Sequence, residues 1–176
     1  MPGPYHSSLN TFDGRVLCNM GIMPIKTRFK GPAQPLSDPN ALDIIDESLD
    51  FFKANLFFRN YEVQGVADRV LIYLTLYIQQ ALTKIATKDK GGAEKELYQL
   101  AIANFTIPGD GAFPLGGFVS NPASRADGDT IRQYFLQLRQ ETNVRLIARV
   151  YAFGDREPSK WWTCFIKRKF LNMSLD

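Results

Sequence analysis

The segment from Gly65 to about Ile85 constrains the fold most, because a helix here would be apolar around most of its circumference. The apolar residues that define this helical period are Val66, Val70, Leu74, Ala81 and Ile85. Spacings of four and seven are typical of a helix. The β-branched and aromatic residues of the run also suit a strand, which stays open as an alternative. We predict a helix around which other helices pack.

A second helix is predicted between Asn40 and Asn60, with apolar residues on two faces. One face carries Leu42, Ile45, Leu49, Phe52 and Leu56, and the nearly opposite face carries Ile44, Phe51 and Phe58. Asp38 or Asn40 is the expected N-cap. Between the two faces lies a narrow acidic strip, formed by Asp43, Asp46, Glu47 and Asp50. We interpret the strip as a solvated or partner-facing edge, placed where the helix dipole favours negative charge.

Two further helices are predicted on either side of an irregular segment. Gly91 and Gly92 should interrupt the helical pattern, so that a short helix covers Glu94–Asn104. Residues 105–128 are rich in glycine and proline, and their phenylalanines should tie this loop down. Asp127 or Asp129 then caps a helix that extends to about Val150.

The first forty residues contain six prolines, and this density excludes a continuous helix there. We therefore predict an extended arm that lies on the body and carries the cations Lys26, Arg28 and Lys30. The fold class that follows is all-α: residues 1–176 form a single compact helical domain with a central hydrophobic helix surrounded by others. Residues 105–128 are its ordered irregular loop, and residues 158–176 are a basic aromatic tail.

The chemical inventory is narrow, with one histidine and two cysteines. His6 stands in a proline-flanked arm, and we predict no catalytic role for it. A disulfide framework or a zinc cluster needs more ligands than Cys18 and Cys164 supply. The two cysteines could pair, but in a chain that is not secreted we expect two free, mostly buried thiols. Neither a cofactor nor a metal site is predicted. A secretory signal pattern is lacking, and the nine-residue uncharged stretch Val70–Ile78 is shorter than the roughly twenty residues of a membrane span, so we expect a cytosolic chain without membrane insertion.

The tail combines both tryptophans with four cations: Lys160, Trp161, Trp162, Lys167, Arg168 and Lys169. Two functions fit this combination. In the first, one tryptophan packs in the core and the other lies in a protein interface. In the second, the tryptophans and cations bind single-stranded nucleic acid. The 21 basic and 18 acidic residues leave a net charge of only +3, which favours the protein interface.

Several long motifs, taken in order, resemble a known family. They are the arm motifs YHSS from Tyr5 and PIKTRFKGP from Pro24, then FFKANLFFRNYEVQGVADRVLIYLTLYI from Phe51, NFTIPGDGAFPL from Asn104, LRQETNVRL from Leu138 and PSKWWTCFIKRKF from Pro158. Together they resemble subunit 3, the 21-kilodalton-class subunit, of the actin-related protein 2/3 complex. Residues 10–15, 87–93 and 152–157 carry no recognisable family pattern.

The resemblance implies an all-α, non-catalytic scaffold subunit of a seven-subunit cytoplasmic complex that nucleates branched actin. It also implies contact with actin-related subunit 3 and support of the branch on an actin filament, with no cofactor of its own and no nucleic acid. We expect the cations of the arm and tail to contact acidic actin-like surfaces, because opposite charges steer association.

Overall fold

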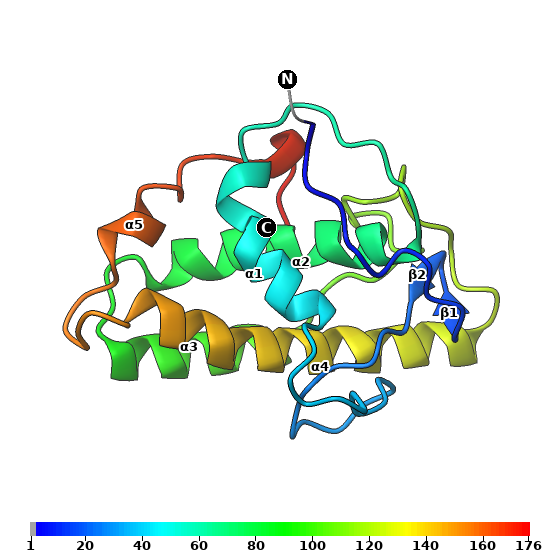
Figure 1. Cartoon of the computed structure of the whole chain (residues 1–176), viewed down its shortest axis with the longest axis horizontal. Coiled ribbons are helices and arrows are strands. Elements are labelled where there is room, and N and C mark those ends of the chain that lie inside the picture. The colour runs from blue at the N-terminus through cyan, green and yellow to red at the C-terminus, as the bar shows by residue number, and fades with distance from the viewer. Residues whose placement is uncertain (1–2) are drawn as a thin grey trace.

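Helix α2 (Val66–Ile85) runs through the middle of the computed structural model, which describes residues 3–176 (Figure 1). Fifteen of its twenty residues are buried. It contacts α1 (Ile44–Asn55), α3 (Lys90–Ile102), α4 (Arg125–Val150), the short helix α5 (Lys160–Thr163) and the 3₁₀ turn η1 (Phe170–Asn172). The prediction of a central helix is confirmed, and the strand alternative is wrong. None of the described helices combines the length and the apolarity that a membrane crossing requires.

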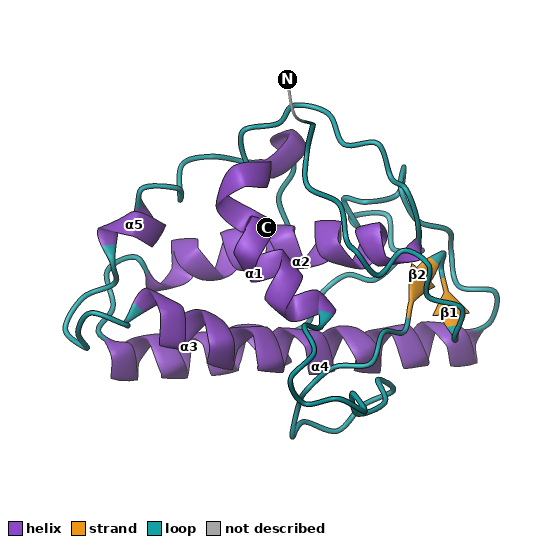
Figure 2. Cartoon of the chain, viewed as in Figure 1, coloured by secondary structure: helices purple, strands orange, loops and turns teal. Residues whose placement is uncertain are grey.

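The arm contains the only β-strands found within residues 3–176, so the all-α prediction needs correction (Figure 2). Strand β1 (Val16–Leu17) pairs antiparallel with β2 (Met20–Gly21). The two residues between them, Cys18 and Asn19, have φ angles of 56° and 63°. Positive φ at both central residues defines the type I′ turn, whose twist suits a tight hairpin, and asparagine tolerates this conformation well.

Helix α1 is shorter than predicted, and its cap is Asp43 rather than Asp38 or Asn40. The Asp43 side chain accepts a hydrogen bond from the backbone N–H of Asp46, and the Asp46 side chain accepts one from the N–H of Asp43. This reciprocal capping box satisfies two N–H groups that the first helical turn leaves free. The helix therefore begins after the cap, and Leu42 is exposed outside it.

The acidic strip of α1 is not a solvated edge: that prediction is wrong for three of its four residues. Asp43 and Glu47 are buried, and Asp46 is mostly covered. Arg145, from the C-terminal half of α4, binds both Asp43 (Nη1–Oδ1 2.6 Å) and Asp46 (Nη1–Oδ1 3.0 Å). Asp50 alone stays exposed, paired with Arg149 at 2.9 Å. Asp43 and Asp46 can be covered here because α4 supplies a guanidinium opposite them, whereas Glu47 is bound by the arm.

Two helix starts also differ from the predicted ones. Helix α3 begins at Lys90, because Asp89 caps it by accepting a hydrogen bond from the N–H of Gly92. The two glycines therefore lie inside the first turn and do not interrupt the helix. Helix α4 begins at Arg125 and is capped by Ser124, whose hydroxyl accepts a hydrogen bond from the N–H of Asp127. Asp127, predicted as a cap, lies in the first turn and favours the helix through its charge.

The start of the arm is clasped between α1 and α2 by two buried carboxylates. Asp68 accepts hydrogen bonds from the N–H of Ser7 (2.8 Å) and lies 2.7 Å from Nδ1 of His6. Glu47 accepts hydrogen bonds from the hydroxyls of Ser7 and Ser8 and from the N–H of Ser8 (2.8 Å). Burial disfavours the Asp68 anion. The hydrogen-bond donors around Asp68, among them the N–H of Ser7 and Nδ1 of His6, outweigh this effect and hold the pKa of Asp68 below its ordinary value.

A second buried polar group joins α2, α3 and α4. The guanidinium of Arg139 donates to the carbonyl of Leu100 (2.6 Å) near the end of α3 and lies 4.6 Å and 4.3 Å from the ring centroids of Tyr77 and Phe105. Its charge has no carboxylate partner within residues 3–176 and is stabilised instead by aromatic faces and by the negative end of the α3 dipole. This cation fixes the spacing of the three helices.

The segment between α3 and α4 lies on the body through its apolar side chains. Phe113 and Leu115 are buried, and Phe113 packs against Phe135 with ring centroids 6.2 Å apart. Arg69 of α2 donates to the carbonyl of Phe118 (2.7 Å). These contacts fix a long irregular segment that otherwise has few backbone hydrogen bonds of its own.

Candidate protein-interaction surface

The two adjacent tryptophans of the tail point in different directions. Trp162 is only 7% exposed and stacks on Phe52 of α1, with ring centroids 6.0 Å apart. Trp161 is 63% exposed. The expectation that at least one tryptophan is buried is confirmed. The nucleic-acid alternative loses one of its two stacking platforms, because the ring of Trp162 is covered by the core, and nothing else in residues 3–176 favours it.

Cations and aromatic rings alternate where the tail crosses the end of α1. The ammonium of Lys53 lies 4.2 Å from the ring centroid of Trp162, and the guanidinium of Arg168 lies 4.3 Å from that of Phe57. Phe57 is 57% exposed and meets Phe165 edge to face. We call this region the cation–aromatic surface; its residues are Lys53, Phe57, Lys160, Trp161, Phe165, Lys167, Arg168 and Lys169.

No cation of this surface has a carboxylate within ion-pair distance among the residues that the structure describes. Partial burial lowers the pKa of Lys53, and the positive charge of Arg149 acts in the same direction. Aromatic faces attract a cation without cancelling its charge. The guanidinium and ammonium groups can therefore still form charge-assisted hydrogen bonds with carboxylates of another molecule.

The cations of the arm form a separate group and differ among themselves. Lys26 is paired internally, with its ammonium 2.7 Å from Asp46 and its carbonyl accepting from Arg145 (2.6 Å). Arg28 and Lys30 are exposed and have no ion pair in the described part of the chain. The arm group lies at the N-terminal end of α1 and the tail group at its C-terminal end, so the twelve-residue helix separates them by about 18 Å. They do not form one patch.

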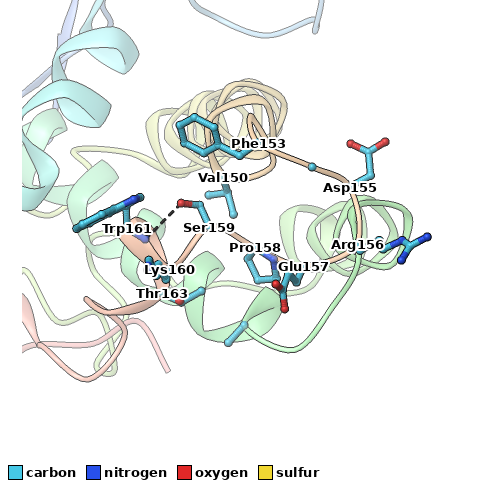
Figure 3. A pocket seen from close by; sticks show the side chains of 12 residues that line it. Val150, Phe153, Asp155, Arg156, Glu157, Pro158, Ser159, Lys160, Trp161 and Thr163 are labelled. Atoms are coloured by element: carbon cyan, nitrogen blue, oxygen red, sulfur yellow. Dashed lines mark hydrogen bonds between the residues drawn. The ribbon is translucent and has the colours of Figure 1, made fainter.

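Next to the cation–aromatic surface, an open hollow of about 990 Å³ lies between the loop that follows α4 and the start of α5 (Figure 3). Phe153, 88% exposed, and Trp161 stand beside it, and Val150 and Pro158 contribute to its lining. Sequence reasoning missed Phe153, which lies in a stretch without any recognised pattern. It also missed Lys53 and Phe57, although Phe57 belonged to neither apolar face of the predicted helix and was therefore an available signal.

The histidine and the two cysteines are the side chains with most potential for catalysis or metal binding. His6 binds Asp68 and packs on Tyr61 with ring centroids 4.7 Å apart, so its ring belongs to the clasp of the arm. Across residues 3–176, no cluster of three or more His, Cys, Asp or Glu side chains is arranged to hold a metal ion. Both cysteines are free, as predicted; Cys18 is buried, whereas Cys164 is exposed, contrary to expectation.

Comparison with known proteins gives a consistent result along the whole chain. The P21-Arc family, the ARPC3 (21 kDa) subunit of the ARP2/3 complex, matches residues 1–175. The chain is 57% identical over 173 residues to actin-related protein 2/3 complex subunit 3 of Dictyostelium discoideum, covering 97% of this chain and 99% of that protein. Identity to the proteins of the same name is 45% in Schizosaccharomyces pombe (99% and 100% covered) and 38% in Arabidopsis thaliana (96% and 97% covered).

Proposed function

The chain belongs to the P21-Arc family of 21 kDa ARP2/3 complex subunits, and from this membership we propose that it is a non-catalytic scaffold subunit of that complex. In this role it supports actin filament nucleation and branch formation through protein–protein contacts. Its place in the cell is then the cytoplasm, with the actin cytoskeleton. The observation that carries the proposal is the family match over residues 1–175.

The proposed partners within the complex include actin-related subunit 3, and the proposed wider contact is the actin filament at the branch. Two features of the surface support binding by charge. Among residues 3–176, the tail cations Lys160, Lys167, Arg168 and Lys169 have no carboxylate partner, and neither have Arg28 and Lys30 of the arm. Complementary charge raises association rates and excludes partners of like charge. The exposed ring of Trp161 adds an apolar contact of the kind enriched in interfaces.

A charge-reversal experiment tests this proposal in the assembled complex. The tail variant carries Lys167→Glu, Arg168→Glu and Lys169→Glu. The matched control also reverses three charges, Lys84→Glu, Lys88→Glu and Lys95→Glu, at exposed lysines remote from the tail in the sequence. Each chain is co-expressed with the remaining subunits at physiological salt, and the amount that co-purifies and the number of branches per filament are measured.

We expect the tail variant to lose most of its incorporation or of its branching activity, whereas the control retains both. Arg28→Glu with Lys30→Glu tests the arm in the same way. If the tail variant and the arm variant assemble and branch like the unmodified chain, binding through these charges is refuted. If the unmodified chain itself fails to co-purify with the other subunits, the scaffold role is refuted.

A further inference from the structure

The hollow beside Phe153 and Trp161 is open and, at about 990 Å³, wide enough for a short segment of another protein. We propose that it receives an apolar anchor residue from an extended segment of a neighbouring subunit, an inference that rests on the proposed function. Its lining includes the apolar side chains of Ala86 and Pro158, both partly exposed. Two aromatic rings flank it, and such rings are typical anchors at the centre of an interface.

A small molecule fits this site poorly. Pockets for small ligands cover most of the ligand surface and direct a few buried polar groups at it. Here Phe153 is 88% exposed, and the charged residues of the loop, Asp155, Arg156 and Glu157, are exposed as well. A hollow with such open walls buries little of the surface of a small ligand. A protein segment can still bind there, because further contacts on both sides of the hollow hold it in place.

The charges around the hollow indicate what kind of segment fits. Lys160 stands at the side of Trp161, with its ammonium 5.6 Å from the ring centroid, and it has no carboxylate partner in residues 3–176. Asp155 lies on the other side, where Arg156 extends away from the hollow (Figure 3). The only ion pair of Asp155 among the described residues is a contact of 4.0 Å with the half-exposed Lys90.

The matching segment therefore has an acidic residue on the Lys160 side of its apolar anchor and a basic residue on the Asp155 side. Complementary charges of this kind fix the direction in which a segment lies. Continuity supports the same assignment, because Trp161 and Lys160 also belong to the cation–aromatic surface. One partner can cover the hollow and part of that surface together.

The walls of the hollow are held in place before any partner binds. The N–H of Ser159 donates to the carbonyl of Val150 (2.9 Å), and the N–H of Lys90 donates to the carbonyl of Asp155 (2.8 Å). The first bond closes the loop onto the end of α4, and the second ties the middle of the loop to the start of α3. A preformed site loses less conformational entropy on binding, which makes a shallow anchor site effective.

The test uses Phe153→Ala and Trp161→Ala, with Tyr98→Ala as the matched control. Tyr98 is an aromatic residue of similar exposure (62%) on α3, outside the hollow. Each variant is co-expressed with a tagged unmodified chain and the other subunits, and the ratio of the two chains in the purified complex is measured. We expect Phe153→Ala and Trp161→Ala each to be under-represented about tenfold, as for an interface hot spot, and Tyr98→Ala to compete equally.

Thermal unfolding of each full-length variant must show an unchanged midpoint, so that a defect in assembly cannot be attributed to misfolding. If Phe153→Ala or Trp161→Ala is destabilised, Phe153→Tyr or Trp161→Phe, which keeps an aromatic wall at the same position, should be incorporated like the unmodified chain. If the unmodified chain assembles but both alanine variants compete equally with it, the anchor site is refuted while the proposed function stands. If sedimentation shows that the isolated chain self-associates through these two residues, a second copy is the occupant and the inference is also overturned.

Discussion

Replacing Arg145 with methionine should strongly destabilise the protein. The guanidinium joins three segments: it binds the carboxylates of Asp43 and Asp46 on α1 and donates to the carbonyl of Lys26 in the arm (2.6 Å). The side chain of Arg145 is 15% exposed and that of Asp43 is fully buried. Methionine keeps much of the apolar stem but removes every donor, so that a buried carboxylate is left without its strongest partner.

Removing one member of a buried ion pair costs about 3 to 5 kcal/mol of unfolding free energy. We expect the lower end, about 3 kcal/mol, because some compensation remains. Asp43 still accepts from the N–H of Lys26 (2.9 Å), and Asp46 still pairs with the Lys26 ammonium (2.7 Å). With a urea m-value of about 2 kcal/mol/M, this loss lowers the unfolding midpoint by about 1.5 M.

Arg149→Met is the matched control, because Arg149 also reaches from α4 to an aspartate of α1. Its contact with Asp50 is 2.9 Å long, but the two side chains are 36% and 44% exposed. Exposed pairs contribute at most about 1 kcal/mol, so the midpoint should fall by less than about 0.5 M. Urea unfolding of the full-length chain, followed by far-ultraviolet circular dichroism, measures both variants.

A second change separates charge from packing. Asp43→Asn keeps a good helix cap and removes the unpaired charge, so adding it to Arg145→Met should recover part of the lost stability. Equal midpoints for Arg145→Met and Arg149→Met would show that the buried network does not stabilise the fold. A double variant no more stable than Arg145→Met would show that the loss comes from packing and not from charge.

Three further predictions concern other parts of the molecule. Trp162→Ala should cost about 3 to 5 kcal/mol in urea unfolding because its ring packs in the core, whereas Trp161→Ala should cost less than about 0.5 kcal/mol; equal costs would contradict the different burial of the two rings. A maleimide should label Cys164 rapidly and leave Cys18 unlabelled until urea unfolds the chain, because burial, reinforced by the charge of Asp127, raises the pKa of the Cys18 thiol; early labelling of both thiols would contradict this. Because the pKa of Asp68 is lowered in the fold, its contribution is complete above the unfolded value of about 3.9 and is lost as pH falls through the lower folded value. The stability advantage of the unmodified chain over Asp68→Asn, measured at pH 7, should therefore shrink as the pH falls below about 4, and a constant advantage would refute the assignment.

Local patterns in the sequence predicted the features that depend on neighbouring residues. The period of Val66–Ile85 identified the central helix, because an apolar residue at nearly every position can be buried only inside a bundle. Burial of one tryptophan of the tail followed from the usual behaviour of such rings next to a core. Helix boundaries were less predictable, since Ser124, Asp127 and Asp129 are all acceptable caps and tertiary packing selects among them.

Features that depend on distant residues could not be predicted. The acidic strip of α1 resembles any solvated helix face until Arg145, about one hundred residues later, is placed opposite it. The candidate surface shows the same limit. Lys160 and Trp161 were identified from their composition, but Lys53 and Phe57 gain significance only because the fold brings Trp162 and Arg168 beside them.

The hydrogen bonds that hold the arm determine when the arm can fold during synthesis of the chain. Ser7 and Ser8 leave the ribosome among the first residues, yet their acceptors belong to Glu47 and Asp68. The arm therefore has no binding site until the growing polypeptide has delivered the first turn of α2. The segment that is synthesised first can bind only after α1 and the first turn of α2 have been synthesised. During that interval the apolar residues of its hairpin are exposed to chaperones and proteases.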